Sequence, residues 1–495
     1  MTRSARGPLA DSYAGAVLLV VFALVPFLLL TAAAFPLLPL IAKSTGLSMS
    51  ALNLATALSD AGYALGTVLA VQFAVHLPAR RLLLGYLLVF VIAAVLAAWA
   101  PAGPVFFAAF VVEGLCTSLM LIAAVPPLVT GWPPAKMPIT GMIMNLCIFG
   151  AVAIGPSVGG ALAASGSWRP LFWAVAGMAA LSLVFALLTY DDVPPQDTSA
   201  PWDIVAVSLA AVGCGAAFFG AGELQGAGAA PVALVPLVAG AAMIVALVVH
   251  QYRTKQPLMP VRQIATAFPV SGILTAMCAS AAAFGLMELV LSTLQKSSTP
   301  GHIALLFLPE FGAALLTAVV FGALFRTRFT PVLAAGGLVM IAAAAALLTG
   351  LASGQDAVVA AASGLIGLGV GASVSPSLFI TGFSLRSAQI QRVFALVELL
   401  RGVTAFLVAP ILVYLSTVIG SSPVAGTRTA VWICLAIAAA GAIAAVTVFT
   451  ASGGRLQKPD LEAWEGGEPA WTSPPLLSRV RRQSAGERED RRVRT

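Results

Sequence analysis

The chain has 495 residues, of which 60% are hydrophobic and 9% are charged, with a formal net charge of +7. A mean hydropathy of +0.99 lies far outside the range of a soluble globular protein of this length. These values exclude an aqueous catalytic domain and indicate a polytopic membrane protein. Because the basic residues are spread over loops and the C-terminus, no nucleic-acid partner is expected.

Apolar stretches long enough to cross a bilayer occur about fourteen times along the chain. We expect helices at residues 16–42, 53–76, 82–99, 104–130, 140–163, 170–189, 203–222, 230–250, 268–294, 303–325, 331–350, 356–382, 392–418 and 429–450. No small-residue cleavage site follows the first stretch, so it is expected to remain as a helix rather than to be removed as a signal peptide. An all-α integral membrane protein is predicted.

Loop charges predict the orientation of these helices. If residues 1–15 are cytoplasmic, the inside loops hold Arg80, Arg81, Lys136, Arg253, Lys255, Arg262, Arg326, Arg328, Arg386 and Arg392, whereas the outside loops hold Lys43, Arg169, Lys296 and Arg428. Cytoplasmic loops of membrane proteins are enriched in Lys and Arg, so both termini are predicted inside. The loop with Asp191, Asp192 and Asp197 is an acidic exception, and acids contribute little to orientation.

Residues 451–495 differ in composition from the rest of the chain. They are rich in Gly, Pro, Ser, Glu and Arg and end in a run of alternating basic and acidic residues. Such a composition predicts a disordered cytoplasmic tail.

Two short basic turns suggest an internal repeat. Arg80 and Arg81 follow the second predicted helix, and Arg326 and Arg328 follow the tenth, each pair between apolar residues. Matching turns in two halves are typical of secondary transporters. We therefore expect a six-helix bundle at residues 16–189, a cytoplasmic loop at 190–202, two inserted helices at 203–250, a second cytoplasmic loop at 251–267 and a second six-helix bundle at 268–450. The alternative is that any short inside loop becomes basic.

The fifth predicted helix carries the most specific local pattern. It reads Gly150-Ala-Val-Ala-Ile-Gly155-Pro156-Ser-Val-Gly159-Gly160, and a Trp-Arg turn follows at residues 168–169. Small residues let two helices approach closely, and proline bends a helix. Ordinary packing of glycine-rich helices is the structural alternative. The pattern resembles the antiporter motif of the major facilitator superfamily, in its fourteen-helix drug:proton antiporter branch, where this helix is associated with export.

The resemblance covers nearly the whole membrane region, but several positions depart from the family pattern. Val75 and Pro78 stand where the turn after the second helix normally has Asp and Gly. The fourth helix has Phe110 and Glu113 where the family has Arg and Gln. Gly150 is one residue early, and the first helix lacks the acid common in the branch. These departures weaken the expectation of standard drug:proton exchange.

Charged side chains inside a bilayer are costly, so each embedded one is a candidate functional residue. Asp60 in the second helix and Glu113 in the fourth lie at similar depths and would share a proton if their helices touch. The structural alternative is that each carboxyl accepts hydrogen bonds from a neighbouring Ser, Thr or backbone group.

The second half contains four more embedded charges. Glu310 follows Pro309, where an interrupted helical hydrogen-bond ladder accommodates a protonatable side chain. Glu398 and Arg401 are three residues apart and share a helical face, as an internal ion pair or as a charge relay. In the fourteen-helix branch, acids in the tenth and thirteenth helices recur as proton or cation sites, which favours Glu310 and Glu398. For Glu288, near the end of the ninth helix, contact with the membrane interface is the structural alternative.

No motif indicates a cofactor. The five cysteines have no close pairing, the three histidines fall at helix ends, and no zinc spacing, phosphate loop or nucleophile elbow is present. Neither a metal nor another cofactor is expected. Without a phosphate loop, the energy for transport must come from an ion gradient or from the gradient of the substrate.

We therefore expect a secondary active transporter of the cell membrane, not an enzyme, that exports small lipophilic compounds, including cations, by proton antiport, as multidrug-resistance proteins do. Helices 1, 4, 9 and 12 would line a midplane cavity, and helices 2, 5, 10 and 13 would contribute gates. The expected partners are a small-molecule substrate, protons and membrane lipids, and the protein is expected to be a monomer. The alternatives are a metabolite exporter or uniporter of the same fold and a non-transporting membrane sensor.

Overall fold

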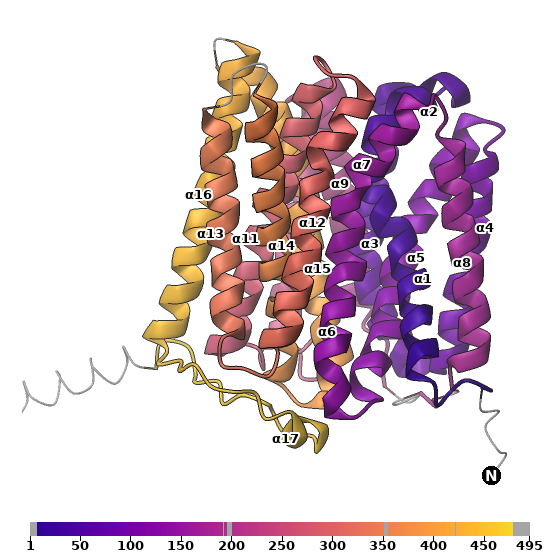
Figure 1. Cartoon of the computed structure of the whole chain (residues 1–495). Coiled ribbons are helices and arrows are strands. Elements are labelled where there is room, and N and C mark those ends of the chain that lie inside the picture. Colours follow the sequence, from indigo (N-terminus) through magenta and orange to yellow (C-terminus); the bar gives the residue numbers. More distant parts are fainter. Residues whose placement is uncertain (1–6, 192, 196–199, 351–354, 421, 479–495) are drawn as a thin grey trace, which may run out of the picture.

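The computed structural model describes residues 7–191, 193–195, 200–350, 355–420 and 422–478. Within these ranges, 14 helical segments are long and apolar enough to cross a membrane. They run side by side, and the described ends of the chain lie on the same side of the molecule (Figure 1). We call this side the terminal side and the opposite one the far side. The predicted fold class is confirmed.

The helices form two bundles of six spans with two helices between them. The N-terminal bundle comprises α1 (Tyr13–Ala33), α3 (Met49–His76), α4 (Ala79–Trp99), α5 (Gly103–Thr130), a fifth span built from η2 (Pro134–Lys136), α6 (Met137–Asn145), η3 (Leu146–Gly150) and α7 (Ala151–Ala164), and α8 (Arg169–Thr189). The inserted helices are α9 (Ile204–Ala227) and α10 (Pro231–Arg253). The C-terminal bundle comprises α11 (Ala267–Leu294), α12 (Pro300–Leu324), α13 (Thr330–Thr349), α14 (Asp356–Phe383), η4 (Ser387–Gln389), α15 (Ile390–Val418) and α16 (Pro423–Ala451).

The first and fifth spans are less regular than predicted. The first ends as a helix at Ala33 and continues through η1 (Phe35–Leu37) into α2 (Leu38–Thr45), because Pro36 and Pro39 lack the N–H groups that a regular helix needs. The fifth contains a π-helical turn at η3. A π-turn adds one residue to a helix, and such turns are frequent at functional sites. The added residue coincides with the one-residue offset of Gly150 in the sequence pattern.

Two pairs of helices join the bundles. The fifth span packs against α12, and α3 packs against α15. On the far side, the Ser157 hydroxyl donates a hydrogen bond of 2.7 Å to the Ala304 carbonyl. On the terminal side, a Cβ on Gly141 would lie 2.6 Å from the Phe325 ring. The bundles therefore touch at both membrane sides.

The inserted helices are held to α3 at their terminal ends. Asp203, which precedes α9, accepts a hydrogen bond of 3.0 Å from His250 and one of 2.9 Å from Gln251, both of α10. The ring of His76 at the end of α3 stacks on Trp202, with centroids 4.3 Å apart. Partial burial opposes ionisation of Asp203, but hydrogen bonds from the α9 backbone and from the two α10 side chains outweigh it and lower the pKa of this carboxyl.

The segment after α16 corrects the expectation of a disordered tail at 451–495. Residues 455–478, which we call the strap, run along the terminal side and include the short helix α17 (Leu461–Glu465) (Figure 1). Trp464 is buried and donates a hydrogen bond of 2.9 Å to the Leu385 carbonyl. Two tryptophans in a polar segment supply the apolar surface that orders it. Residues 479–495, and with them the charged end of the tail, lie outside the described ranges, as do Asp192 and Asp197.

The glycines of α7 sit where other helices approach its backbone. A Cβ on Gly155 would lie 2.6 Å from Ala32 Cβ, and one on Gly159 would overlap the Ala33 carbonyl oxygen. On another face of α7, a Cβ on Gly160 would lie 2.6 Å from the Pro300 carbonyl oxygen of α12. The small residues thus allow α7 to contact both the first span and the second bundle.

We predict that Gly159→Ala destabilises the protein by about 1–3 kcal/mol, because the added methyl group must displace a backbone carbonyl. The measurement is thermal unfolding of the purified protein in detergent. Gly177→Ala in α8 is the matched control, because nothing lies within 4 Å of its added Cβ. Equal unfolding temperatures for the two variants would contradict this account of the motif.

Candidate functional site

A closed hydrogen-bond network joins the two bundles near the middle of the membrane. The Tyr63 hydroxyl of α3 donates to Glu398 Oε2 of α15 at 2.9 Å. Arg401 donates to the same oxygen from Nε at 3.1 Å and from Nη2, and it also donates from Nη2 to the Tyr63 hydroxyl at 3.2 Å. The predicted Glu398–Arg401 ion pair is therefore present, with Tyr63 as a third member from the other bundle.

This network is buried: its exposed fractions are 0% for Tyr63, 1% for Glu398 and 2% for Arg401. Two buried charges are tolerated when they pair with good geometry and further hydrogen bonds. The Arg401 guanidinium carbon also lies 5.7 Å from the centroid of the Phe149 ring, within the range of a cation–π interaction. Phe149 belongs to η3, and its ring, which contacts Arg401, also forms part of the wall of the neighbouring cavity.

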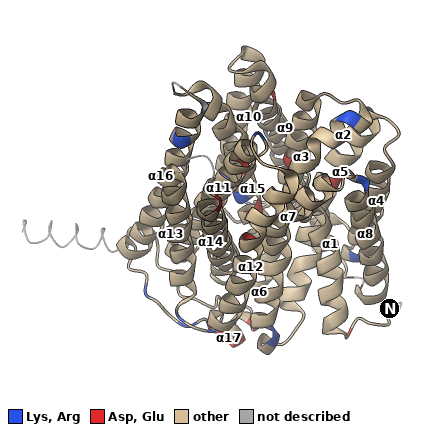
Figure 2. Ribbon diagram, turned by 45° about the horizontal axis from the view of Figure 1, so that its top comes forward, with Lys and Arg blue, Asp and Glu red and all other residues tan. Residues whose placement is uncertain are grey.

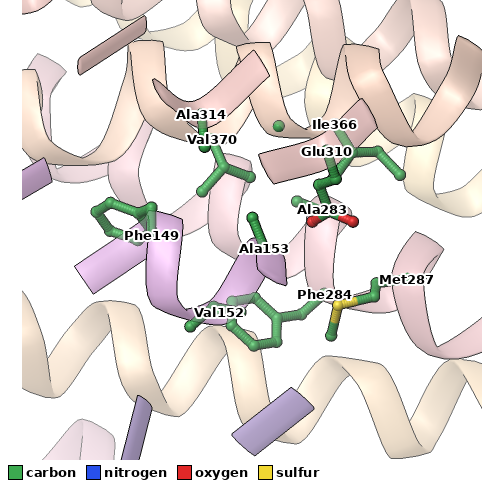
Figure 3. A pocket seen from close by; sticks show the side chains of 11 residues that line it. Phe149, Val152, Ala153, Ala283, Phe284, Met287, Glu310, Ala314, Ile366 and Val370 are labelled. Carbon is green, nitrogen blue, oxygen red and sulfur yellow. The ribbon is translucent and has the colours of Figure 1, made fainter. Parts of the chain in front are cut away.

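That cavity lies between the bundles and contains Glu310. It has a volume of about 10 Å³, close to the minimum that holds one water molecule. Its walls come from the fifth span, α11, α12 and α14: Phe149, Val152, Ala153, Ala283, Phe284, Met287, Ala314, Ile366, Gly367 and Val370. The Glu310 carboxyl points toward Ala153, Phe284 and Met287 (Figure 3). A single carboxyl thus faces an otherwise apolar space shared by both bundles.

Glu310 is held close to α14. A Cβ on Gly367 would overlap the Glu310 carbonyl oxygen, so only glycine allows this approach. The Ser363 hydroxyl of α14 donates to the Leu306 carbonyl at 2.9 Å, near the site where Pro309 interrupts the α12 ladder. Glu310 is 4% exposed, and its Oε2 is buried without a hydrogen-bond partner among the described residues.

Asp60 of α3 lies close enough to Glu288 of α11, in the other bundle, for their charges to interact. Both residues are partly exposed. α3 and α5 do pack together, but Glu113 is not among the groups that interact electrostatically with Asp60. Proton sharing between Asp60 and Glu113 stays a prediction, and Glu288 is a second acid within electrostatic range of Asp60.

Glu113 lies inside the N-terminal bundle. It is fully buried, and neither carboxyl oxygen has a hydrogen-bond partner in the part of the chain described; the same is true of the Tyr86 hydroxyl on α4. Cys116 lies close enough to both groups to interact electrostatically. The alternative in which Ser, Thr or backbone groups satisfy this carboxyl is wrong for Glu113.

The hydrogen bond that the structure describes for the first basic turn stays within one bundle. Arg80 donates to the Leu187 carbonyl at 3.0 Å, which ties α4 to α8 within one bundle. Arg81, Arg326 and Arg328 are exposed, and the Arg328 guanidinium lies over its neighbour Phe329. Figure 2 shows the remaining charges as sparse, mainly at helix ends, with a small group inside near α11 and α15.

Sequence reasoning missed Tyr63 and Phe149. Tyr63 follows Asp60 by three residues and so shares its helical face, which was an available signal. Phe149 precedes the displaced Gly150, and that displacement was the only local sign of the π-turn. Across the described ranges, no group of three or more His, Cys, Asp or Glu side chains has the arrangement of a metal site.

Comparison with known proteins gives consistent matches. A family model described as Major Facilitator Superfamily matches residues 20–408. The chain is similar to the lincomycin resistance protein LmrB of Bacillus subtilis (strain 168), with 30% identity over 170 residues, which are 34% of this chain and 35% of that protein. It is also similar to the uncharacterized MFS-type transporter YcnB of the same organism, with 26% identity over 184 residues, which are 37% of this chain and 39% of that protein. The matched regions thus span little more than a third of these curated relatives.

Solved structures share the fold. The human organic anion transporter MFSD10 (TETRAN) superposes with a TM-score of 0.61 at 12% identity, over 88% of this chain and 99% of that one. A POT family transporter in complex with a thioalcohol conjugated peptide gives 0.64 at 12% identity, over 89% and 96%. The proton:xylose symporter XylE bound to 6-bromo-6-deoxy-D-glucose gives 0.60 at 15% identity, over 92% and 99%. At such identities the similarity establishes the fold alone.

The central network predicts strongly non-additive mutant stabilities. Glu398→Gln alone leaves the Arg401 charge buried without its counter-ion and is expected to destabilise the protein by about 3–5 kcal/mol. The double variant Glu398→Gln/Arg401→Met removes both charges and should recover most of that loss. Thermal unfolding in detergent measures both. A double variant that is less stable than Glu398→Gln alone would contradict the role of this pair as mutually compensating charges.

Proposed function

The chain belongs to the major facilitator superfamily, a superfamily of membrane transporters rather than enzymes, and from this premise we propose that it exports small lipophilic cations in exchange for protons. The observation that carries the proposal is the Glu310 carboxyl in the cavity between the bundles. It is the one carboxyl in that lining, and the lining comes from both bundles. A group in this position is exposed to whichever side the bundles open.

The proposed cycle follows from the cost of burying a charge. An ionised carboxylate without a partner is costly in the closed cavity, so Glu310 is neutral there. Opening toward one side admits water, which lets the proton leave. The resulting carboxylate attracts a cation, and protonation from the other side releases it. Proton and substrate thus compete for one group, which gives the substrate different affinities for the two protonation states.

The closed cavity also requires the bundles to move. Ligand pockets for drug-sized molecules have volumes of about 300–1,000 Å³, whereas this cavity has about 10 Å³. Separation of the bundles along the fifth span and α12, or along α3 and α15, would enlarge it. Alternating access about the midplane is the usual motion for repeats of this kind.

The proposed orientation follows from the loop charges, and the proposed substrate class from the acids. Most loop arginines and lysines lie at the terminal side, which we assign to the cytoplasm of a cell with this protein in its plasma membrane. The embedded acids Asp60, Glu113, Glu288, Glu310 and Glu398 outnumber the single embedded arginine, which favours a cationic substrate. The name of one relative refers to lincomycin resistance, which is consistent with export of a drug-like compound.

We predict that adding a lipophilic cation to everted vesicles dissipates an imposed pH gradient, and that Glu310→Gln abolishes this effect. An acridine dye reports the gradient. The reason is that an amide at position 310 cannot exchange a proton with the substrate.

Glu223→Gln is the matched control, because this acid lies near the far end of inserted helix α9, away from the cavity lining. It should behave as wild type. Transport of labelled compound without proton movement in the wild type would contradict antiport and support a uniporter, for which the apolar first helix already argues.

A further inference from the structure

The buried polar atoms that lack a hydrogen-bond partner fall into two groups within the described ranges. One comprises the Tyr86 hydroxyl and the Glu113 carboxyl oxygens, inside the N-terminal bundle. Besides Glu310 Oε2, the other comprises Asn145 Oδ1, Ser280 Oγ, Ser375 Oγ and Ser377 Oγ, which belong to the fifth span, α11 and α14. These four residues are at most 1% exposed. Buried unpaired polar atoms are rare in folded proteins and often mark bound water.

The three serines differ from other buried hydroxyl residues of the same bundle. Thr381 of α14 and Ser384 at its C-cap donate to backbone carbonyls four residues earlier, at 2.9 and 2.7 Å. Ser373 of α14 donates to the Ala334 carbonyl at 3.0 Å. Such bonds satisfy a hydroxyl in an apolar helix. Ser280, Ser375 and Ser377 make no such bond, so their hydroxyls have donor and acceptor capacity left for another partner.

The unpaired atoms lie at different depths in the bundle. By the rise of an α-helix, Glu310 and Ser280 lie roughly 20 Å from the terminal ends of their helices, and Ser375 lies roughly 12 Å from the end of α14. Ser377 follows Ser375 by two residues and so lies on nearly the opposite face of α14, away from the Ser375 side. Asn145 lies at nearly the depth of Ser375, because its amide donates a hydrogen bond of 3.0 Å to the Gly371 carbonyl, one helical turn before Ser375. The series draws on the fifth span, α11 and α14, which also line the Glu310 cavity.

We propose that Asn145, Ser280 and Ser375 bind a file of water molecules that carries protons between Glu310 and the terminal side. The inference rests on the proposed antiport and deepens it by giving the proton a route separate from the substrate. The Glu310 carboxyl donates its proton to the first water, each water passes one proton on, and the last releases it toward the terminal side. No group other than Glu310 changes its net protonation.

The test uses Ser375→Ala, with Ser373→Ala as the matched control on the same helix. If water already satisfies the Ser375 hydroxyl, its removal leaves the unfolding temperature unchanged and slows substrate-driven proton movement about tenfold, with substrate affinity preserved. The control loses a protein hydrogen bond, so its unfolding temperature falls while proton movement per folded molecule stays at the wild-type rate.

Two results would overturn the proposal. A raised unfolding temperature in Ser375→Ala would mean that this hydroxyl has no water partner and only destabilises the fold. Unchanged proton movement would mean that protons take another route. The unfolding measurement needs no substrate, so it tests the hydration of the hydroxyl even if the wild type moves no protons. A wild type that moves no protons would contradict the proposed antiport instead.

A separate set of contacts points to the gate at the end of this route. Phe379 of α14 packs against Phe325 of α12, with centroids 5.1 Å apart, where Gly141 of the N-terminal bundle meets the same ring. The strap covers the neighbouring ring: Trp464 lies 4.5 Å from Phe383, between ring centroids. Aromatic side chains from both the strap and the helices therefore close the terminal side of the bundle interface.

The strap is fastened to one bundle and reaches the other. Ser473 hydrogen-bonds Thr266 at 2.8 Å, and the Ala470 N–H donates to the Phe383 carbonyl at 2.8 Å, both in the C-terminal bundle. From there α17 crosses to η2 of the N-terminal bundle, with Cα atoms within 8 Å. We infer that the strap is a latch that holds the terminal side closed and must leave η2 whenever that side opens.

Cysteine pairs test the latch. Ala135→Cys/Glu465→Cys joins two exposed positions on η2 and α17, and Thr266→Cys/Ser473→Cys fixes the strap to its own bundle. A reducible bis-maleimide cross-linker should stop transport in the first pair, with recovery on reduction, and should leave the second pair active.

Full transport by the cross-linked first pair would overturn the latch, and so would failure of that pair to cross-link in active protein. Formation of the cross-link is scored on gels and needs no substrate. A first pair that cross-links in protein without measurable transport would therefore count against the proposed transport function rather than against the position of the strap.

Discussion

The cost of an uncompensated charge inside a membrane governs this structure. Every embedded ionisable group must be paired, neutral or in contact with water. Arg401 meets this constraint through Glu398 and Tyr63, and the three side chains tie the bundles together at mid-depth. Glu310 has no such partner, so its charge state must change with the opening of the bundles. The same constraint thus accounts for the fixed ion pair of Arg401 with Glu398 and for the changing charge of Glu310. Phe149 contacts both sites, because its ring lies near the Arg401 guanidinium and also lines the Glu310 cavity.

The surrounding packing turns that variable group into a coupling device. Glycines of α7 and α14 let helix backbones approach without intervening side chains, so the closed state excludes almost all space around Glu310. The bundles contact each other on both membrane sides. Opening one side breaks the contacts on that side and can keep those on the opposite side. A transporter needs such exclusive openings, because simultaneous access from both sides would dissipate the gradient.

Much of the fold was predictable from sequence because a membrane span requires a continuous apolar run. The fourteen spans, the two bundles and the Glu398–Arg401 pair followed from that rule and from helical spacing. Features that depend on packing between distant segments did not: Tyr63 completes the pair only because α3 meets α15, and Glu288 of one bundle comes within electrostatic range of Asp60 of the other. The strap was missed because its polar composition conceals two anchoring tryptophans, Trp464 and Trp471.

The central claim is that substrate and proton compete for Glu310. The most direct measurement is proton release by the purified protein in weakly buffered detergent when a lipophilic cation binds, followed with a pH indicator. The account predicts release by the wild type and none by Glu310→Gln, in which the competing proton is absent. Binding without proton release in the wild type, or equal release by both proteins, would contradict it.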